Sequence, residues 1–369
     1  MLKSAQSVKS PHKGLEHLAA EHLRAALTGI PFLTPQDSSF AHSLDSKGAD
    51  FTLSVEARGR PWKLVCEVKH SGQPRYVREG AFQLRRYLFS LASDHAYGVF
   101  IAPYLSEESA ALLREESLGY LDFAGNCFLS FDGVFVERSG SDHRPERRRA
   151  LREIFAPKAS KILRVLFTDP NRSWRVTDLA KRAAVSLGQV SNVRRALLDR
   201  EWASIDPQGL KLLKPAKILD EWRAAYTPRL ARERHYYTLL HGEALIRALK
   251  AAFAAISSDQ QLLLASFSAA QWLAPFARVA GTFCYSDDVG EAILKEKLQL
   301  QPAAKGTNVT IATPKDDGVF IDSYEPAPGL RCTGALQTYL DLSAAGERGG
   351  EAADHLRQAR LEPPWQSRP

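Results

Sequence analysis

The sequence predicts an α/β domain, then a compact helical unit, then a region of mixed α+β structure. Residues 12–137 alternate between helical and strand-like apolar patterns, and a polar, Arg-rich stretch follows at residues 138–152. Helical spacing resumes at 153 and ends in a hairpin by 222. The 369 residues have room for two or three domains, since domains usually have about 100–200 residues. We therefore expect an N-terminal domain (12–137), a basic linker (138–152), a helical unit (153–222) and a C-terminal domain (223–362).

The composition is typical of a soluble globular protein, with 44% hydrophobic and 25% charged residues. The net charge of +7 suits an anionic partner such as nucleic acid, although a basic surface alone would explain it equally well. The four cysteines lack CxxC spacing, which argues against a zinc site and a disulfide scaffold, and we expect Cys66 and Cys127 to be buried thiols. The N-terminus lacks an apolar signal core, and polar residues interrupt the apolar stretch from Leu262. We expect a cytoplasmic protein without a membrane segment.

The N-terminal domain is expected to be an α/β sandwich around a mixed sheet. Its first helix, with apolar residues at helical spacing, should span residues 13–26. "FTLSVEA" and "PWKLVCEVK" should be strands joined by the turn "RGRP". The later elements that we expect are a helix at 78–92, a strand at 97–103, a helix opening at Ser106, and one or two strands at 127–138.

Three charged residues lie where these two strands can bring them together. Side chains alternate across a strand, so Glu67 and Lys69 share one face, beside the strand that begins at Asp50. If the strands are neighbours, Asp50 and Glu67 converge and can hold Mg²⁺, which prefers carboxylate oxygens. A bound metal activates water and stabilises a phosphoryl transition state, and Lys69 would orient that water or neutralise phosphate charge. The alternative is the ordinary polar edge of a sheet.

The following helix adds Gln83 and Tyr87, which are four residues apart and so lie on one face. With Ala49-Asp50 and Glu67-Val68-Lys69, this pattern resembles the PD-(D/E)xK nuclease superfamily, which has a restriction-endonuclease-like fold. It is most similar to the RecB branch, which adds a QxxxY motif on this helix. Ala49 stands where the family name has Pro.

The resemblance covers residues 12–137 and implies specific roles. The catalytic residues would be Asp50, Glu67, Lys69, Gln83 and Tyr87. The metal would bind Asp50 and Glu67, together with a Glu of the first helix, for which Glu16 is preferred to Glu21 because it lies nearer the apolar face. Domains of this kind also serve as DNA- or RNA-binding modules without cleavage.

The helical unit has the pattern of three helices and a β-hairpin, which is a winged helix-turn-helix. A first helix around residues 162–166 must stop before Pro170, and Thr177 is a suitable N-cap for the second. Ser186, with Gln189 three residues later, forms a capping box for the third helix. "ASI" and "LKLL" flank the turn "DPQG".

In a winged helix-turn-helix the second helix of the pair enters the major groove of DNA. The residues that we expect on its outward face are Gln189, Ser191, Asn192, Arg194 and Arg195. Amide side chains read adenine, Arg reads guanine, and Lys181 and Arg182 of the preceding helix would contact the phosphate backbone. Three alternatives stay open: Gln189 only caps its helix, Arg194 and Arg195 form a solvated face, or the unit contacts protein.

The last third should be helical from about 223, strand-like after about 278, and helical again near the end, with His235, Tyr236 and Tyr237 packing on a helix. The segments "LLLASFSAAQWLAP", "GTNVTIATPKDDGVFID" and "ALQTYLDLSAAGERGGEAADHLR" resemble the C-terminal domain of the AbiEi antitoxins of type IV toxin–antitoxin systems. That resemblance spans about 160–362. It implies a repressor that binds its own promoter and counteracts a separately encoded nucleotidyltransferase toxin.

The leading interpretation is a cytoplasmic, antitoxin-type regulator of transcription that binds double-stranded DNA and carries a nuclease-like N-terminal domain. The alternative is a Mg²⁺-dependent nuclease for defence or DNA processing that the winged helix targets to DNA. A third possibility is a protein-interaction scaffold whose nuclease-like fold is inert. The short antitoxins lack the N-terminal domain, which is why the enzyme interpretation stays open.

Overall fold

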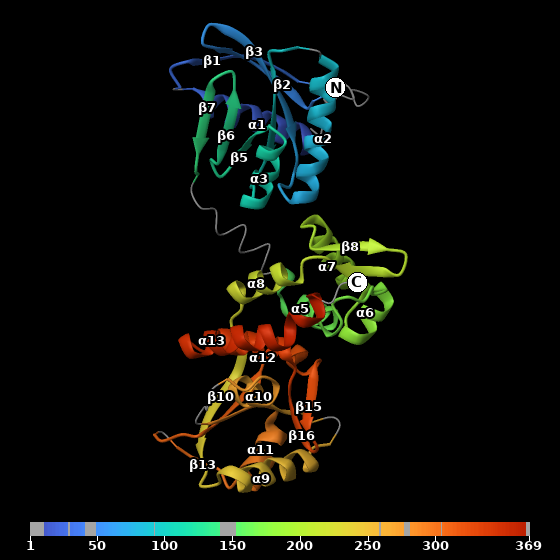
Figure 1. The fold of residues 1–369 in the computed structure, drawn as a ribbon, viewed down its shortest axis with the longest axis vertical. Helices are drawn as coiled ribbons and strands as arrows, with labels where there is room; N and C mark the ends of the chain where they lie inside the picture. Colours follow the sequence, from blue (N-terminus) through green and yellow to red (C-terminus); the bar gives the residue numbers. More distant parts are fainter. Residues whose placement is uncertain are drawn as a thin grey trace, which may run out of the picture. The chain divides into compact units, whose positions relative to one another are not determined.

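A computed structural model describes residues 11–28, 30–40, 49–91, 93–140, 153–257, 260–276, 281–303 and 305–366. The chain divides into two compact units, residues 1–147 with 199–201 and residues 148–198 with 202–369 (Figure 1). Most of the expected basic linker, residues 141–152, lies outside the described residues. The fold class is mixed α/β with two mixed sheets, one in each unit.

The first unit is built on a seven-stranded sheet whose strands follow one another in chain order. Only the β3–β4 and β4–β5 pairs are parallel, and the others are antiparallel. The strands are β1 Leu33–Phe40, β2 Phe51–Ala57, β3 Arg60–Val68, β4 Ala96–Ala102, β5 Gly119–Asp122, β6 Cys127–Phe131 and β7 Val134–Arg138. β1 and β5 were not expected, because β1 is polar and contains Pro35, and β5 is only four residues long.

Helices cover this sheet on both faces, as the predicted sandwich requires (Figure 1). α1 (Pro11–Leu27) buries Leu23 and Leu27 in the core that includes Leu64 and Cys66 of β3. α2 (Pro74–Leu91) and α3 (Glu107–Glu115) pack on the other face, in the core that includes Val65. Alternation along β3 therefore places odd-numbered residues, including Glu67, on the α2 side.

The second unit begins with three helices and a two-stranded hairpin. These are α5 (Pro157–Thr168), α6 (Val176–Ala183), α7 (Leu187–Asp199), β8 (Ala203–Asp206) and β9 (Gly209–Leu212). Ala184 adopts a left-handed conformation, with φ of 50°, and this lets only three residues connect α6 to α7. Trp174 forms a β-bridge with Leu210 and so joins the segment before α6 to the hairpin.

The predicted cap of α7 is confirmed, whereas that of α6 is wrong. The Ser186 hydroxyl accepts a hydrogen bond of 3.2 Å from the Gln189 backbone N–H. α6 begins one residue before Thr177, with Arg175 at the N-cap and no side-chain cap bond. Thr177 therefore lies inside the first turn of α6.

Ser186→Ala is expected to lower the free energy of unfolding by about 1 kcal/mol, because the Gln189 N–H loses its acceptor. Urea unfolding of the full chain measures this. Ser191→Ala, on the same helix and exposed, is the control and should change stability by less than about 0.5 kcal/mol. Equal effects of the two substitutions would contradict the cap.

The C-terminal region of this unit holds a second seven-stranded sheet, with the order β13-β10-β14-β12-β11-β16-β15. Its strands are β10 Leu230–Tyr237, β11 Leu262–Leu264, β12 Thr282–Ser286, β13 Gln301–Pro302, β14 Val309–Pro314, β15 Ser323–Ala327 and β16 Leu330–Thr333. Its helices are α8 Pro215–Ala225, α9 Gly242–Ala255, α10 Ser266–Leu273, α11 Asp288–Lys297, η1 Asp317–Phe320, α12 Ala335–Ser343, α13 Glu347–Leu356, η2 Arg357–Leu361 and α14 Pro363–Gln366. One hydrophobic core, from Ile154 to Leu361, joins the first three helices to this sheet.

The expectation of continuous helix after residue 223 is wrong at β10 and β11. His235, Tyr236 and Tyr237 lie on a strand that pairs with β14, and only Tyr236 of the three is buried. The alternation of side chains that is typical of a strand is present in "RERHYY", because every second residue, Arg232, Arg234 and Tyr236, contacts the buried carboxylate of Glu291. Charged residues carry that alternation, so hydrophobic periodicity did not reveal it.

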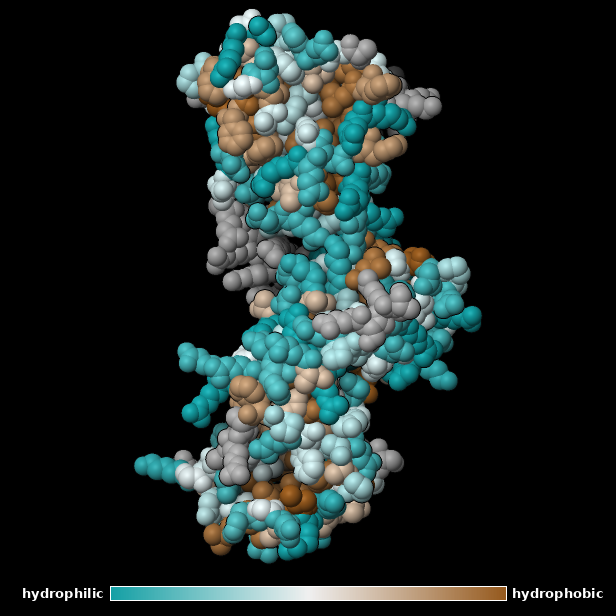
Figure 2. Space-filling view, viewed as in Figure 1, coloured by the Kyte–Doolittle hydropathy of each residue, from teal (hydrophilic) through white to brown (hydrophobic). Residues whose placement is uncertain are grey.

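Two further expectations concern the cysteines and the absence of a membrane segment. Cys66 and Cys127 are buried free thiols, as predicted, and so are Cys284 and Cys332. Within the described ranges, no helix is both long and apolar enough to span a membrane. Figure 2 shows a mainly hydrophilic surface on each unit, with apolar residues in scattered groups.

Candidate functional site

The structure brings Asp50 and Glu67 together at the ends of neighbouring strands. β2 and β3 are antiparallel with Phe51 opposite Cys66, so Asp50, one residue earlier, lies beside Glu67. The Asp50 carboxylate accepts a hydrogen bond of 2.7 Å from the Val68 backbone N–H. Glu67 is buried on the α2 side of the sheet, with 5% of its surface exposed. A hairpin of the predicted length therefore places two carboxylates side by side.

Lys69 and Gln83 complete this cluster. The Lys69 ammonium lies 2.7 Å from a Glu67 carboxylate oxygen and donates a hydrogen bond of 2.8 Å to the Gln83 side-chain carbonyl. Gly80 lets α2 approach the sheet closely, because a Cβ there would come within 2.5 Å of the Phe100 ring. The close approach puts Gln83, one turn after Gly80, over the end of β3.

The pKa of Glu67 is raised from 4.5 to about 7. Burial is the largest cause, and the neighbouring Asp50 carboxylate is the next, whereas the hydrogen bond and charge of Lys69 oppose them. Two carboxylates that share a buried site disfavour each other's charge, and a divalent cation between them relieves that repulsion. The donor set of Asp50 and Glu67 therefore fits Mg²⁺.

Tyr87 and Glu16 are the other two predicted members of this site. Tyr87 is one turn beyond Gln83 on α2 and packs, half-buried, against the core on that side of the sheet. Glu16 lies on α1, which covers the opposite face. Among the residues that the structure describes, no three His, Cys, Asp or Glu side chains gather to hold a metal. The structure does not unite Glu16 with Asp50 and Glu67.

A second candidate site is the outward face of α6 and α7. Ser191, Asn192 and Arg195 are exposed on α7, and Val190, Val193 and Leu197 of the same helix are buried. Gln189 and Arg194 are half-buried, and Lys181 and Arg182 are exposed on α6. The amide and basic side chains of α7 thus lie opposite its core-facing residues. The basic residues Lys181 and Arg182 of α6 precede them closely in the chain.

Sequence reasoning missed a tryptophan that organises this surface. Trp174 is buried, and the guanidinium groups of Arg172 and Arg182 lie 4.2 and 5.3 Å from its ring centroid. Arg182 is therefore held against the segment that bridges to the hairpin. The motif "RSWR" was the available signal, since arginines flank a single aromatic residue before a helix.

The chain was compared with known proteins. Residues 211–362 match the family described as "Transcriptional regulator, AbiEi antitoxin, Type IV TA system". The match begins in β9 and runs through the C-terminal sheet to the end of η2. It confirms the predicted resemblance to the AbiEi antitoxins over these residues. The matched residues do not include α6 or α7. Neither the curated proteins nor the solved structures gave a match.

Proposed function

We propose that this protein is a DNA-binding transcriptional regulator of the antitoxin type, acting in a type IV toxin–antitoxin system. The observation that supports this most strongly is the match of residues 211–362 to the AbiEi family. The partners that the family description implies are DNA and a cognate toxin, and a nucleotidyltransferase is the toxin class that we propose.

DNA binding is assigned to residues 157–212 as a winged helix-turn-helix. The support is the short connection at Ala184, the hairpin after α7 and the polar outer face of α7. In this proposal Asn192 and Arg195 contact base edges, with Gln189, Ser191 and Arg194 beside them. Lys181 and Arg182 contact phosphates, so raising the salt concentration weakens binding.

The regulator role can be tested in cells. A reporter gene is placed behind the DNA upstream of this protein's own gene, and the protein is supplied separately. The proposal expects repression by the wild type and its loss in Arg195→Ala. Co-expression with an adjacent nucleotidyltransferase gene should restore growth that the toxin alone arrests. Unchanged reporter activity together with unrelieved arrest would rule the proposal out.

The Asp50–Glu67 cluster favours a second candidate function, metal-dependent cleavage of nucleic acid by a PD-(D/E)xK-type domain. The specific observation is the raised pKa of Glu67 beside Asp50, with Lys69 in contact. Mg²⁺, when bound, would polarise a phosphate and activate water. Lys69 would hold a proton near the reacting phosphate, and Gln83 would fix the position of Lys69.

Cleavage is expected to require all three charged residues. Asp50→Asn, Glu67→Gln and Lys69→Ala should each slow Mg²⁺-dependent cleavage by about a hundredfold or more, the range for losing a group that assists proton transfer. The assay incubates purified protein with labelled DNA or RNA, with Mg²⁺ or with EDTA. Glu56→Gln, an exposed carboxylate of the same sheet, is the control. If the wild type leaves both substrates intact in Mg²⁺ and Mn²⁺, the enzyme candidate is rejected.

A further inference from the structure

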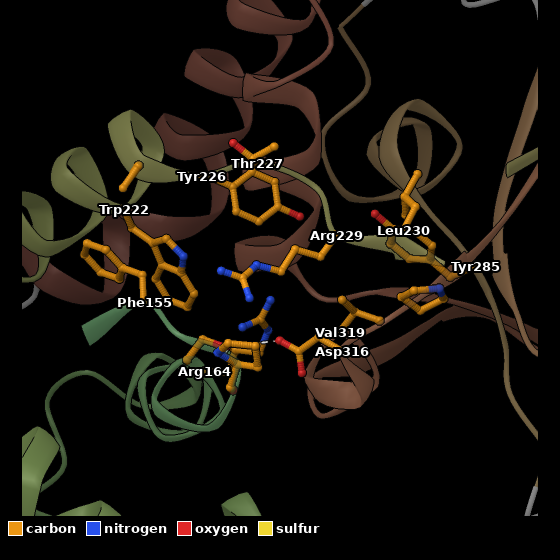
Figure 3. A pocket seen from close by; sticks show the side chains of 14 residues that line it. Phe155, Arg164, Trp222, Tyr226, Thr227, Arg229, Leu230, Tyr285, Asp316 and Val319 are labelled. Atoms are coloured by element: carbon orange, nitrogen blue, oxygen red, sulfur yellow. Dashed lines mark hydrogen bonds between the residues drawn. The ribbon is translucent and has the colours of Figure 1, made fainter. Parts of the chain in front are cut away.

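A pocket of about 300 Å³ lies within the second unit, between α5, α8 and the C-terminal sheet (Figure 3). Four of its fourteen lining residues are aromatic, namely Phe155, Trp222, Tyr226 and Tyr285. The volume is at the small end of the range for ligand sites. All of the lining residues belong to one unit and share its core or border it.

A buried arginine reaches into this pocket with unused hydrogen-bond donors. Arg164 of α5 is 3% exposed, and its Nη2 donates to the side-chain carbonyl of Gln337. Its Nε and Nη1 have no partner within the described residues. The guanidinium also lies 5.2 Å from the centroid of the Trp222 ring. Unpaired donors on a buried cation are costly, so an acceptor at this position would stabilise the pocket.

A second arginine meets the first from the opposite wall. Arg229, from the segment between α8 and β10, is an exposed residue. Its guanidinium points to the centre of the pocket, toward that of Arg164 (Figure 3). Two cations that face each other across a small cavity attract an anion between them. An oxyanion can accept hydrogen bonds from both guanidinium groups.

Two acidic residues near Arg164, Asp316 and Asp341, accept hydrogen bonds from other residues, although Oδ2 of Asp341 has no partner among the described residues. Asp322 is a third carboxyl that interacts electrostatically with Arg164. Asp316 lines the pocket, and its two oxygens accept hydrogen bonds from the Gly318 backbone N–H, at 2.9 Å, and from the Ser160 hydroxyl, at 3.4 Å. Asp341 lies behind the wall, where one oxygen accepts from Tyr226, Tyr285 and Gln337. Burial raises the pKa of Asp341 to about 6, so it is partly neutral near pH 6. Neither Asp316 nor Asp341 forms an ion pair with Arg164 in the described structure.

We propose that this pocket binds a small organic oxyanion, a carboxylate or a phosphate monoester, through Arg164 and Arg229. The aromatic walls would hold the ring or chain that carries the anionic group. Asp316 lies in the same pocket and reduces its positive charge, which favours the carboxylate over the phosphate monoester, whose charge at pH 7 is about −1.5 to −2. No residue of α7 lines this pocket, so ligand binding there does not depend on DNA binding by that helix.

The test is calorimetric titration of the full chain with two probes, benzoate for the carboxylate and phenyl phosphate for the phosphate monoester. Ionic strength is held constant with chloride. At least one probe is expected to bind with one site per chain. Arg229→Ala should weaken that binding by at least about tenfold, as expected for loss of charge-assisted hydrogen bonds. The tighter probe identifies the type of oxyanion.

Arg348→Ala provides the matched control, because Arg348 is exposed on α13 and lies outside the pocket lining. It should bind the probes as the wild type does. Arg229 is an exposed residue, so its substitution should leave the core intact. Arg164→Met is a second variant, and its unfolding temperature is measured before its binding is compared. The proposal is overturned if neither probe binds saturably, or if Arg348→Ala weakens binding as much as Arg229→Ala does.

Discussion

A double variant, Asn192→Ala with Arg195→Ala, is expected to bind the DNA upstream of the protein's own gene about a hundredfold more weakly than the wild type. Each lost base contact reduces discrimination by roughly 1–3 kcal/mol, and both side chains are exposed on α7. Fluorescence anisotropy of a labelled duplex at fixed salt concentration measures the affinity.

Because these residues lie on the outer face of α7, the variant should keep the far-ultraviolet circular dichroism spectrum of the wild type. Arg348→Ala also removes one positive charge, from an exposed position on α13, and should bind this DNA almost as tightly as the wild type. If the double variant retains wild-type affinity, the groove assignment of α7 is incorrect and the helical unit contacts another partner.

Glu67→Gln is expected to change how the stability of the first unit depends on pH. The folded-state pKa of Glu67 is raised to about 7 from 4.5, so the folded state holds this proton more tightly than the unfolded chain does. The stabilising effect is complete below pH 4.5 and is lost as pH rises through 7. The loss is roughly 3 kcal/mol at most, since one pKa unit corresponds to about 1.4 kcal/mol. Glu67→Gln should abolish this decrease in stability with rising pH, because Gln does not titrate.

Peptide-resolved hydrogen exchange of β3 and β4 follows the opening of this unit in the full chain. Protection in the wild type should fall between pH 5 and 8, after correction for intrinsic exchange rates, more steeply than protection in Glu67→Gln. Glu56→Gln should behave like the wild type, because Glu56 is exposed. Parallel pH profiles for all three proteins would show that Glu67 does not titrate in this range.

The Asp50–Glu67–Lys69–Gln83 cluster was predictable because each step follows from local geometry. Two strands joined by a short turn must be antiparallel neighbours, which aligns Asp50 with Glu67. Glu67 and Lys69 lie two residues apart on the chain, and Gln83 follows on the first helix after that strand. The placement of Glu16 was not predictable, because sequence spacing does not say which face of a sheet a preceding helix covers.

The second unit shows where sequence reasoning reaches its limit. Within "KILRVLF" of α5, Arg164 interrupts an apolar run, and helical periodicity alone suggests an exposed position. Its burial depends on Trp222 and Gln337, which are distant in sequence. β10 was missed for a related reason, because its alternating residues are charged and only the Glu291 carboxylate reveals their shared face. Long-range partners determine both features.

The regulator that we propose would contain both units. We propose that the outer face of α7 contacts DNA, and the C-terminal sheet belongs to the region that matches the antitoxin family. In this account the first unit adds a metal-dependent nucleic-acid site to the regulator. The proposed regulator function depends on DNA recognition, whereas the cleavage candidate depends on the Asp50–Glu67 cluster.

Anisotropy titration of the full-length wild type in EDTA tests DNA recognition most directly. One duplex carries the DNA upstream of the protein's own gene, and the other is a shuffled duplex of equal length and composition. The account predicts at least about a thousandfold tighter binding to the upstream duplex, as for sequence-specific regulators. Equal affinity for the two duplexes, or no binding to either, would contradict it.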